Sequence, residues 1–160
     1  MTEAPEIRIV RLLTERKQTL TVAESCTGGY VAHCLTNVPG ASAVFSVGLV
    51  TYSNGAKQKF LGVNAATLER HGAVSEPVAR EMAEGARRTA GADYAIAITG
   101  IAGPAGGTPG KPVGTVFIAV ASARETRASR QFNPGERVEF KEATARQALE
   151  QLLALLDAPS

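Results

Sequence analysis

The sequence predicts an α/β fold, a three-layer α/β/α sandwich with a mixed β-sheet, and three observations support this prediction. Segments with helical spacing of apolar residues alternate with short apolar segments typical of buried strands. Residues 93–100 are almost continuously apolar, as expected for a strand that helices cover on both sides. Residues 113–122 and 127–132 are predicted to form a hairpin, which adds antiparallel pairing to the sheet.

The first half of the chain is expected to hold two helices and two strands. Residues 7–17 place apolar side chains at helical spacing, and residues 19–25 alternate apolar and polar side chains as a short strand does. A helix over residues 26–40 is expected to open at a turn of Ser, Thr and glycine and to stop at its Pro-Gly pair. Residues 44–53, rich in Val and aromatic residues, form the second predicted strand.

Three further helices are expected in the second half. A turn at Asn54-Gly55 leads into a short helix. Ser75 is expected to cap a longer helix that has Pro77 in its first turn and Gly91 beyond its end. The predicted buried stripe of that helix consists of four side chains: Val78, Met82, Ala83 and Ala86. The last helix is expected from about residue 136 to residue 156.

Length and composition predict one domain over residues 1–160. A chain of 160 residues with 44% hydrophobic content can bury about 70% of its unfolded surface. The 17 Lys and Arg and the 15 Asp and Glu leave a charge of +2 without a basic tract, so no nucleic-acid partner is expected. The absence of a signal-peptide pattern and of a long apolar run predicts a cytoplasmic protein without membrane contact. No metal-ligand spacing occurs, so neither a metal nor another cofactor is expected.

Ser25, Thr27 and Gly28 lie in the segment AESCTGG, where a predicted strand runs into glycines and then a helix. Backbone N–H groups and the positive end of the helix converge at such a point and can bind an anion. The alternative is that Ser25 or Thr27 only caps the helix. The glycines of this segment match neither the GxGxxG spacing nor the GxxxxGK spacing of nucleotide-binding loops, which supports that alternative. Cys26 is a further candidate nucleophile, but no histidine stands in a recognisable arrangement with it, which favours a small buried cysteine.

The loop after the strand at residues 93–100 is a second candidate binding segment. It holds six glycines from Gly100 to Gly114, among them Gly103. Loops at the carboxyl ends of strands bind ligands in α/β sheets, and glycines let the backbone approach a ligand closely. The alternative is a flexible connection before the hairpin, and the length of the loop favours binding.

Ser42, Tyr52 and Lys57 surround the second predicted strand. The helix dipole disfavours a cation in a first helical turn, so a partly buried Lys57 would have a lowered pKa and act as a neutral base. The Ser42 hydroxyl needs such a base to become a nucleophile, and Tyr52 can relay the proton or orient the amine. From spacing alone, a surface lysine, a strand-end tyrosine and a capping serine are the simpler interpretation.

Distance sets a condition on these three residues. Ser42 and Tyr52 would lie about 33 Å apart if the chain between them were fully extended. They can meet only if the chain reverses after Pro39-Gly40, with a helical turn near residues 41–45, or if a second subunit completes the site.

Arg137 stands in NPGERVEF, a Pro-Gly turn ahead of the last predicted helix. Its guanidinium there can clamp a phosphate or a carboxylate. A salt bridge to a neighbouring acid is the alternative.

Five segments occur in one order and together resemble a known family: TVAESCTGG, GASAVF with GLVTYSNGAKQKFLGV, HGAVSEPVAREMAEGAR, ADYAIAITGIAGPAGGTPGKPVGTVFIA and a final GER. They are similar to the CinA C-terminal family over about residues 12–156. That family includes a stand-alone nicotinamide-nucleotide amidase. The resemblance therefore implies hydrolysis of the carboxamide of nicotinamide mononucleotide (NMN) to nicotinate mononucleotide and ammonia, in pyridine-nucleotide recycling, by a Ser/Lys/Tyr amidase without a metal.

The resemblance also assigns roles by position. Ser42 is the implied nucleophile, Lys57 its base and Tyr52 an assistant to the base. Thr99 and Arg137 match positions of substrate binding, and the segments AESCTGG and TGIAGP match the walls of the pocket.

Two positions depart from the family pattern. Glu136 stands where the family often has Asp. Lys141 stands where the family tends to have Arg, so if this position touches the phosphate, a bidentate guanidinium contact is replaced by the point charge of an ammonium group. The N-terminal pyrophosphatase domain of long CinA proteins is not expected here, and its activity is not assigned.

Three expectations about assembly and function complete the sequence-based prediction. Small domains of this kind are commonly symmetric homo-oligomers, which is the expected assembly. An amidase for another nucleotide or carboxamide is an enzymatic alternative. A non-catalytic nucleotide-binding or interaction module is the alternative from another class, in line with the family's association with competence and DNA damage.

Overall fold

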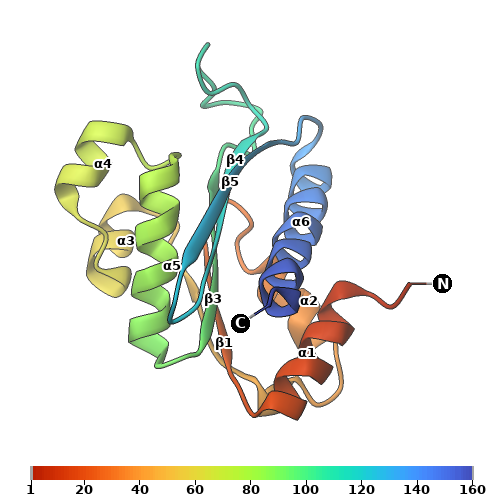
Figure 1. The fold of residues 1–160 in the computed structure, drawn as a ribbon. Coiled ribbons are helices and arrows are strands. Elements are labelled where there is room, and N and C mark those ends of the chain that lie inside the picture. The colour runs from red at the N-terminus through yellow and green to blue at the C-terminus, as the bar shows by residue number, and fades with distance from the viewer. Residues whose placement is uncertain (1, 160) are drawn as a thin grey trace.

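A five-stranded sheet runs through the middle of the molecule, and helices cover both of its faces (Figure 1). The computed structural model describes residues 2–159. The strands are β1 (Leu20–Glu24), β2 (Phe45–Val50), β3 (Tyr94–Gly100), β4 (Thr115–Ala121) and β5 (Thr126–Phe132). The helices are α1 (Pro5–Arg16), α2 (Tyr30–Thr36), α3 (Asn54–Leu61), α4 (Ala65–His71), α5 (Glu76–Ala90) and α6 (Arg137–Asp157), with a short 3-10 helix, η1 (Ala41–Ala43), ahead of β2. This is the α/β sandwich that the sequence predicts.

The strand order in the sheet is β2-β1-β3-β4-β5. Strand β1 pairs in parallel with β2 and β3, whereas β4 pairs antiparallel with β3 and β5, so the sheet is mixed as predicted. The last residues of β1 and β2, Glu24 and Val50, lie opposite each other. The chain therefore leaves these two parallel strands at the same edge of the sheet, which is the edge where α/β folds bind ligands.

Two helical layers enclose the sheet, with α1, α2 and α6 on one face and α3, α4 and α5 on the other (Figure 1). Side chains of β3 alternate between the two cores, because successive residues of a strand point to opposite faces. Ile96 and Ile98 pack against the first layer, whereas Ala95 and Ala97 pack against the second. The predicted stripe of α5 is fully buried against these small alanines, as expected for a helix close to the sheet.

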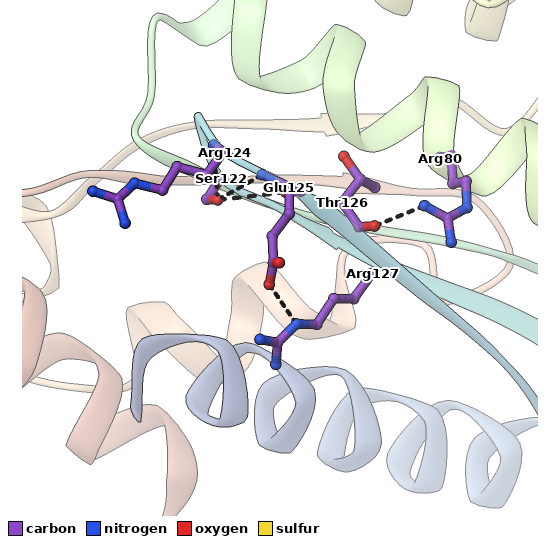
Figure 2. Close-up of polar contacts among 6 residues, drawn as sticks. All are labelled: Arg80, Ser122, Arg124, Glu125, Thr126 and Arg127. Carbon is purple, nitrogen blue, oxygen red and sulfur yellow. Dashed lines mark hydrogen bonds and ion pairs between the residues drawn. The ribbon is translucent and has the colours of Figure 1, made fainter. Parts of the chain in front are cut away.

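Strand β5 forms one edge of the sheet, and charged side chains occupy it (Figure 2). Arg80 of α5 donates a hydrogen bond to the Thr126 carbonyl oxygen at 2.7 Å, and Arg127 pairs with Glu125 at 2.6 Å. In the turn before β5, Ser122 Oγ accepts hydrogen bonds from two backbone N–H groups, each at 3.2 Å. Charged side chains on an edge strand oppose pairing with another chain.

Three local features refine the prediction. Helix α2 begins at Tyr30 and not in the cysteine-containing turn before it, because Gly28 and Gly29 have φ values of +60° and +105° that cannot continue a helix. The 3-10 helix η1 confirms the helical turn expected near residues 41–45. Helix α4 is a short element that the sequence-based prediction lacks.

Within residues 2–159, every helix is too short or too polar to cross a membrane. The cytoplasmic location stays a prediction.

Candidate active site

Glu24 and Ser25 follow one another at the carboxyl end of β1, and their side chains reach opposite layers. Glu24 bonds to residues of α2, whereas Ser25 bonds to Lys57 of α3. Such a division is expected because successive side chains of a strand alternate between its faces. Both residues are buried. The end of β1 thus connects the two helical layers at one point.

Lys57 is buried, with 1% of its surface exposed, and its amine lies against Ser25. Lys57 Nζ donates hydrogen bonds to Ser25 Oγ at 3.0 Å and to the Thr51 carbonyl oxygen at 2.8 Å. Among residues 2–159, no carboxylate forms an ion pair with this amine. Burial lowers the pKa of Lys57, because the charged ammonium loses its hydration. The lowered pKa was predicted from the sequence, and a neutral amine at this distance can accept the proton of the Ser25 hydroxyl.

The segment between β2 and α3 brings Lys57 to this position. The Thr51 N–H donates to the Glu24 carbonyl oxygen at 2.8 Å, which continues the pairing of β1 and β2 by one residue. Ser53 Oγ then accepts a hydrogen bond from the Ala56 N–H at 3.1 Å and caps α3. Thr51 Oγ1 is buried and has no partner within residues 2–159, so it is available to a bound molecule or a water.

Close packing of α3 on α5 also fixes the position of the lysine. A methyl group added to Gly85 of α5 would lie 1.7 Å from the Leu61 carbonyl oxygen at the end of α3. Only glycine permits this approach of two backbones. Since Leu61 and Lys57 lie one turn apart on α3, the Gly85 contact holds the helix at the depth that buries the amine.

The Glu24 carboxylate holds the start of α2. It is fully buried and accepts hydrogen bonds from Thr27 Oγ1 at 2.6 Å, the Val31 N–H at 2.9 Å and the Ala32 N–H at 3.0 Å. Val31 and Ala32 occupy the second and third positions of α2, whose N-cap residue, Gly29, has no side chain to cap them. The carboxylate therefore does the work of an N-cap side chain from outside the helix.

The turn between β1 and α2 presents unpaired backbone donors. Within the described chain, the N–H groups of Thr27 and Gly29 make no hydrogen bond, whereas the Cys26 N–H bonds to its own thiol. The two unpaired groups lie between Ser25 and α2, whose positive end adds to their field. Such donors can stabilise an oxyanion that forms on a group attacked by Ser25.

Cys26 is not suited to be the nucleophile. Burial raises the pKa of its thiol to about 12, although the nearby lysines Lys57 and Lys141 act in the opposite direction. A thiol with this pKa stays protonated near neutral pH and is a poor nucleophile. The sequence-based interpretation of a small buried cysteine is therefore confirmed.

Arg137 joins three segments at the same edge of the sheet. Its guanidinium donates a hydrogen bond to the Gly103 carbonyl oxygen and another, at 3.3 Å, to Tyr52 Oη. Lys141, one turn further along α6, lies beside the turn after β1, since a methyl group on Gly28 would be 3.7 Å from Lys141 Nζ. Lys141 thus lies beside this turn, and Arg137 lies at the ends of the segments that follow β2 and β3, so two cations of α6 are available at this edge for an anion such as a phosphate. Neither cation forms an ion pair with an acid of residues 2–159, so the salt-bridge interpretation of Arg137 does not apply.

Thr99 and Gly100 serve the packing of the glycine loop. Thr99 is buried, and its hydroxyl donates to the Ala73 carbonyl oxygen at 2.8 Å in the segment between α4 and α5. A methyl group on Gly100 would lie 2.8 Å from the Thr115 carbonyl oxygen, so β4 requires glycine there. These contacts fix the end of β3, and a role of either residue in substrate binding stays a prediction.

The structure does not bring Ser42 to Lys57. Ser42 is exposed in η1, before the first residue of β2, whereas the lysine follows the last residue of β2. The two residues therefore lie at opposite ends of β2, and the hydroxyl that accepts a hydrogen bond from the Lys57 amine is that of Ser25. Tyr52 is 62% exposed and bonds to Arg137, not to the lysine. Within one chain, Ser42, Tyr52 and Lys57 are therefore not brought together, and completion of their pairing by a second subunit stays a prediction.

The partnership of Ser25 with Lys57 had a signal in the sequence. Two predicted strands that are joined by a helix pair in parallel, and their carboxyl ends then meet. Ser25 follows the first of these strands and Lys57 follows the second. The role of Glu24 could not be predicted in this way. A carboxylate at a strand end is ordinarily solvated, and its contact with the start of α2 is known only from the fold.

Residues 2–159 contain no group of three or more His, Cys, Asp or Glu side chains that could hold a metal ion.

The fold and the site together define a class: an α/β domain in which a buried lysine and a serine meet at the carboxyl edge of two parallel strands. Comparison with known proteins identifies the family. The family described as "CinA C-terminal domain" matches residues 2–156, and the chain belongs to this family.

Relatives and solved structures agree with this assignment. A CinA-like protein of Anaeromyxobacter sp. (strain K) is 54% identical over 147 residues, which are 92% of this chain and 36% of the relative. A CinA-like protein of Syntrophus aciditrophicus is 53% identical over 159 residues, 99% of this chain and 38% of the relative. The chain thus spans little more than a third of the length of these relatives.

Two crystal structures superpose closely on this chain. The competence/damage-inducible protein CihA from Agrobacterium tumefaciens has a TM-score of 0.93 at 42% identity, covering 96% of this chain and 94% of that one. The competence damage-inducible protein A from Klebsiella pneumoniae has a TM-score of 0.93 at 39% identity, covering 98% and 97%.

Proposed function

We propose that this domain is a nicotinamide-nucleotide amidohydrolase that converts NMN and water to nicotinate mononucleotide and ammonia, with Ser25 as the nucleophile and Lys57 as its base. The observation that carries the proposal is the buried Lys57 amine at 3.0 Å from Ser25 Oγ, without a carboxylate partner in the described chain. A buried lysine with a lowered pKa is a suitable general base for a serine hydroxyl.

In the first step, Lys57 Nζ takes the proton of the Ser25 hydroxyl while Oγ attacks the carboxamide carbon. The oxygen of the amide becomes an oxyanion, and the free N–H groups of the turn after Ser25 are its donors. Collapse of this intermediate breaks the C–N bond, and the Lys57 ammonium returns its proton to the departing nitrogen, which leaves as ammonia.

In the second step, a water molecule hydrolyses the ester on Ser25. Lys57 takes a proton from the water as its oxygen attacks the ester carbon. The Ser25 oxygen leaves, regains the proton from Lys57, and nicotinate mononucleotide is released. Nothing in either step requires an oxidant, a reductant or a metal.

The substrate phosphate is proposed to bind between Arg137 and Lys141. Arg137 is already fixed by Tyr52 and the Gly103 carbonyl oxygen, and Lys141 lies beside the Ser25 turn. Tyr52 is accordingly proposed to support the phosphate side of the pocket and not the proton transfer. Since the relatives are much longer than this chain, the activity proposed is that of this domain alone.

The test is ammonia release from NMN by the purified protein without added metal. Ser25→Ala and Lys57→Met are expected to lower kcat by at least about 1000-fold, as loss of a nucleophile or its base does. Ser42→Ala is the competing variant and is expected to keep wild-type activity. The reverse pattern, with Ser42→Ala inactive and Ser25→Ala active, would return the nucleophile to Ser42 of a second subunit. Tight NMN binding without turnover by the wild type would instead favour a non-catalytic nucleotide-binding module.

A further inference from the structure

The residue next to the proposed nucleophile is a fully buried carboxylate that the mechanism above does not use. Glu24 is the last residue of β1, and within residues 2–159 its two oxygens accept hydrogen bonds only from the start of α2 and from Thr27. An ionised carboxylate without water is costly unless hydrogen bonds and positive charge compensate it. The three bonds and the positive end of α2 supply that compensation.

These bonds fix the turn that contains Ser25 at both of its ends. The turn leaves β1 at Glu24 and enters α2 at Gly29, so the carboxylate ties the first residue of the turn to the helix that follows it. Thr27, in the middle of the turn, is held by the shortest of the three bonds, 2.6 Å from Glu24 Oε1. The Glu24 side chain therefore stabilises the conformation of the turn through hydrogen bonds to its middle and to the helix that follows it.

The same arrangement keeps the donors of the turn available. An ordinary N-cap serine or aspartate would stand in the turn itself and would occupy space at the helix start. Here the capping group comes from the strand, and Gly29 takes the N-cap position with φ +105°. The N–H groups of Thr27 and Gly29 thus have no hydrogen-bond partner within the described chain.

We propose that Glu24 is a positioning residue for the reaction: its carboxylate holds the Ser25 turn so that Oγ meets Lys57 while the free N–H groups face the oxyanion. This inference rests on the proposed function, with Ser25 as the nucleophile. Glu24 touches neither substrate nor the reacting atoms, so its loss should impair the chemical step and leave substrate affinity nearly unchanged.

The structure offers a matched control on the opposite face. Glu81 of α5 caps the start of α4 from outside that helix: it accepts hydrogen bonds from the Asn64 N–H at 2.8 Å and from Thr67 Oγ1 at 2.6 Å. It resembles Glu24 in accepting from a threonine hydroxyl and from a backbone N–H at a helix start, but no candidate active-site residue belongs to α4. A substitution at Glu81 therefore reports the cost of losing such a cap alone.

The kinetic test compares Glu24→Gln with Glu81→Gln in steady-state NMN hydrolysis. Glutamine keeps the shape of the side chain but has one acceptor oxygen fewer and no charge. Glu24→Gln is expected to lower kcat roughly 10- to 100-fold with KM within about twofold, as a small misplacement of reacting groups does. Glu81→Gln is expected to keep both constants. An equal fall of kcat in the two variants, or a rise of KM alone in Glu24→Gln, would overturn the positioning role.

Thr27 and Thr67 supply a milder pair of variants in case Glu24→Gln folds poorly. Thr27→Ala removes the hydroxyl that bonds to Glu24 and is expected to lower kcat with KM unchanged. Thr67→Ala removes the matching hydroxyl that bonds to Glu81 and is expected to keep kcat near the wild-type value. Equal rates in these two variants would contradict the proposal.

A readout that does not depend on NMN separates this inference from the proposed function. A sulfonyl fluoride reagent that labels activated serines can be followed by mass spectrometry at Ser25. Labelling is expected to be about tenfold slower or more in Glu24→Gln than in the wild type and unchanged in Glu81→Gln. Absence of ammonia release with these labelling rates would refute NMN hydrolysis and retain the positioning role. Equal labelling of wild type and Glu24→Gln would overturn the positioning role whatever the substrate.

Discussion

The burial of Lys57 determines how activity depends on pH. Its pKa lies below the ordinary value of a lysine because the ammonium is desolvated, and only the neutral amine can take the Ser25 proton. Activity is therefore expected to be lost as pH falls through this lowered pKa and to rise as pH increases through it. A profile of kcat/KM against pH checks this, with an alkaline-rising limb centred below about 10.4, the ordinary pKa of lysine. A limb centred at the ordinary value would contradict a buried base.

The same shift links Lys57 to stability. The unfolded chain binds a proton at this lysine over the pH range between the lowered folded pKa and the ordinary value, whereas the folded protein does not. The contribution of Lys57 to the free energy of unfolding therefore rises with pH across that range. In Lys57→Met this rise should be absent, which chemical denaturation at several pH values measures.

Arg137 is expected to distinguish substrates by their phosphate. Arg137→Ala should raise KM for NMN at least about tenfold and leave the weaker hydrolysis of nicotinamide riboside nearly unchanged, because loss of a charge-assisted contact to phosphate costs about 1.5–3 kcal/mol. Ammonia release from both substrates provides the comparison. Equal losses for the two substrates would place Arg137 away from the phosphate.

Residue-level inference from the sequence applied to Lys57 but did not reach Ser25. The position of Lys57 predicted a lowered pKa on condition that the side chain is partly buried, and that burial comes from the packing of α3 in the fold. Its pairing with Ser25 spans 32 residues and depends on the parallel pairing of β1 with β2. The family resemblance pointed to Ser42, which the structure places at the other end of β2.

At the scale of elements, the close contact of α3 with α5 predicts different effects of alanine substitution at two glycines. Gly85→Ala would push its methyl group into the Leu61 carbonyl oxygen and displace α3, so it should destabilise the fold by about 1–3 kcal/mol and lower kcat through Lys57. Gly55→Ala, in the first turn of α3, meets only Ser53 Oγ at 4.0 Å and should be neutral or stabilising.

Thermal unfolding and NMN hydrolysis of both variants test the packing of α3 on α5. Lower kcat in Gly85→Ala than in Gly55→Ala is the expected order. Equal activity in the two variants would show that the depth of α3 does not matter for the lysine.

Elements with strong periodicity or clear end signals were predictable. Helix α5 has a capping serine, a proline in its first turn and a glycine at its end, and the structure confirms all three. Helix α4 has seven residues and no side-chain cap, so it offered neither signal. Helix α2 was expected too early, because its cap comes from Glu24 on a neighbouring strand and cannot be recognised locally.

At the scale of the whole molecule, the two edges of the sheet differ. The β5 edge is charged, whereas the β2 edge has no charged residue and exposes Val47 and Val50 by 36% and 54%. An uncharged, apolar edge strand is open to pairing with another chain. If the predicted homo-oligomer forms, β2 is the expected contact between two copies.

Val47→Lys is therefore expected to shift the protein to a monomer, since a lysine on an edge strand opposes pairing. Ile7→Lys, on α1, is the control, because Ile7 is 44% exposed and lies away from the β2 edge. Light scattering on size-exclusion fractions gives the mass of each variant. A monomeric wild type, or an unchanged mass in Val47→Lys, would contradict the contact at β2.

The position of Arg137 has a consequence for the order in which the protein is made. Ser25 and Lys57 leave the ribosome before Arg137, which follows Tyr52 by 85 residues and opens α6. That helix also brings Phe140, Leu149 and Leu152 to the core, so one face of the sheet is only partly covered until α6 has been made. A nascent chain thus receives the proposed reactive pair, Ser25 and Lys57, before the cation that is proposed to select an anionic substrate.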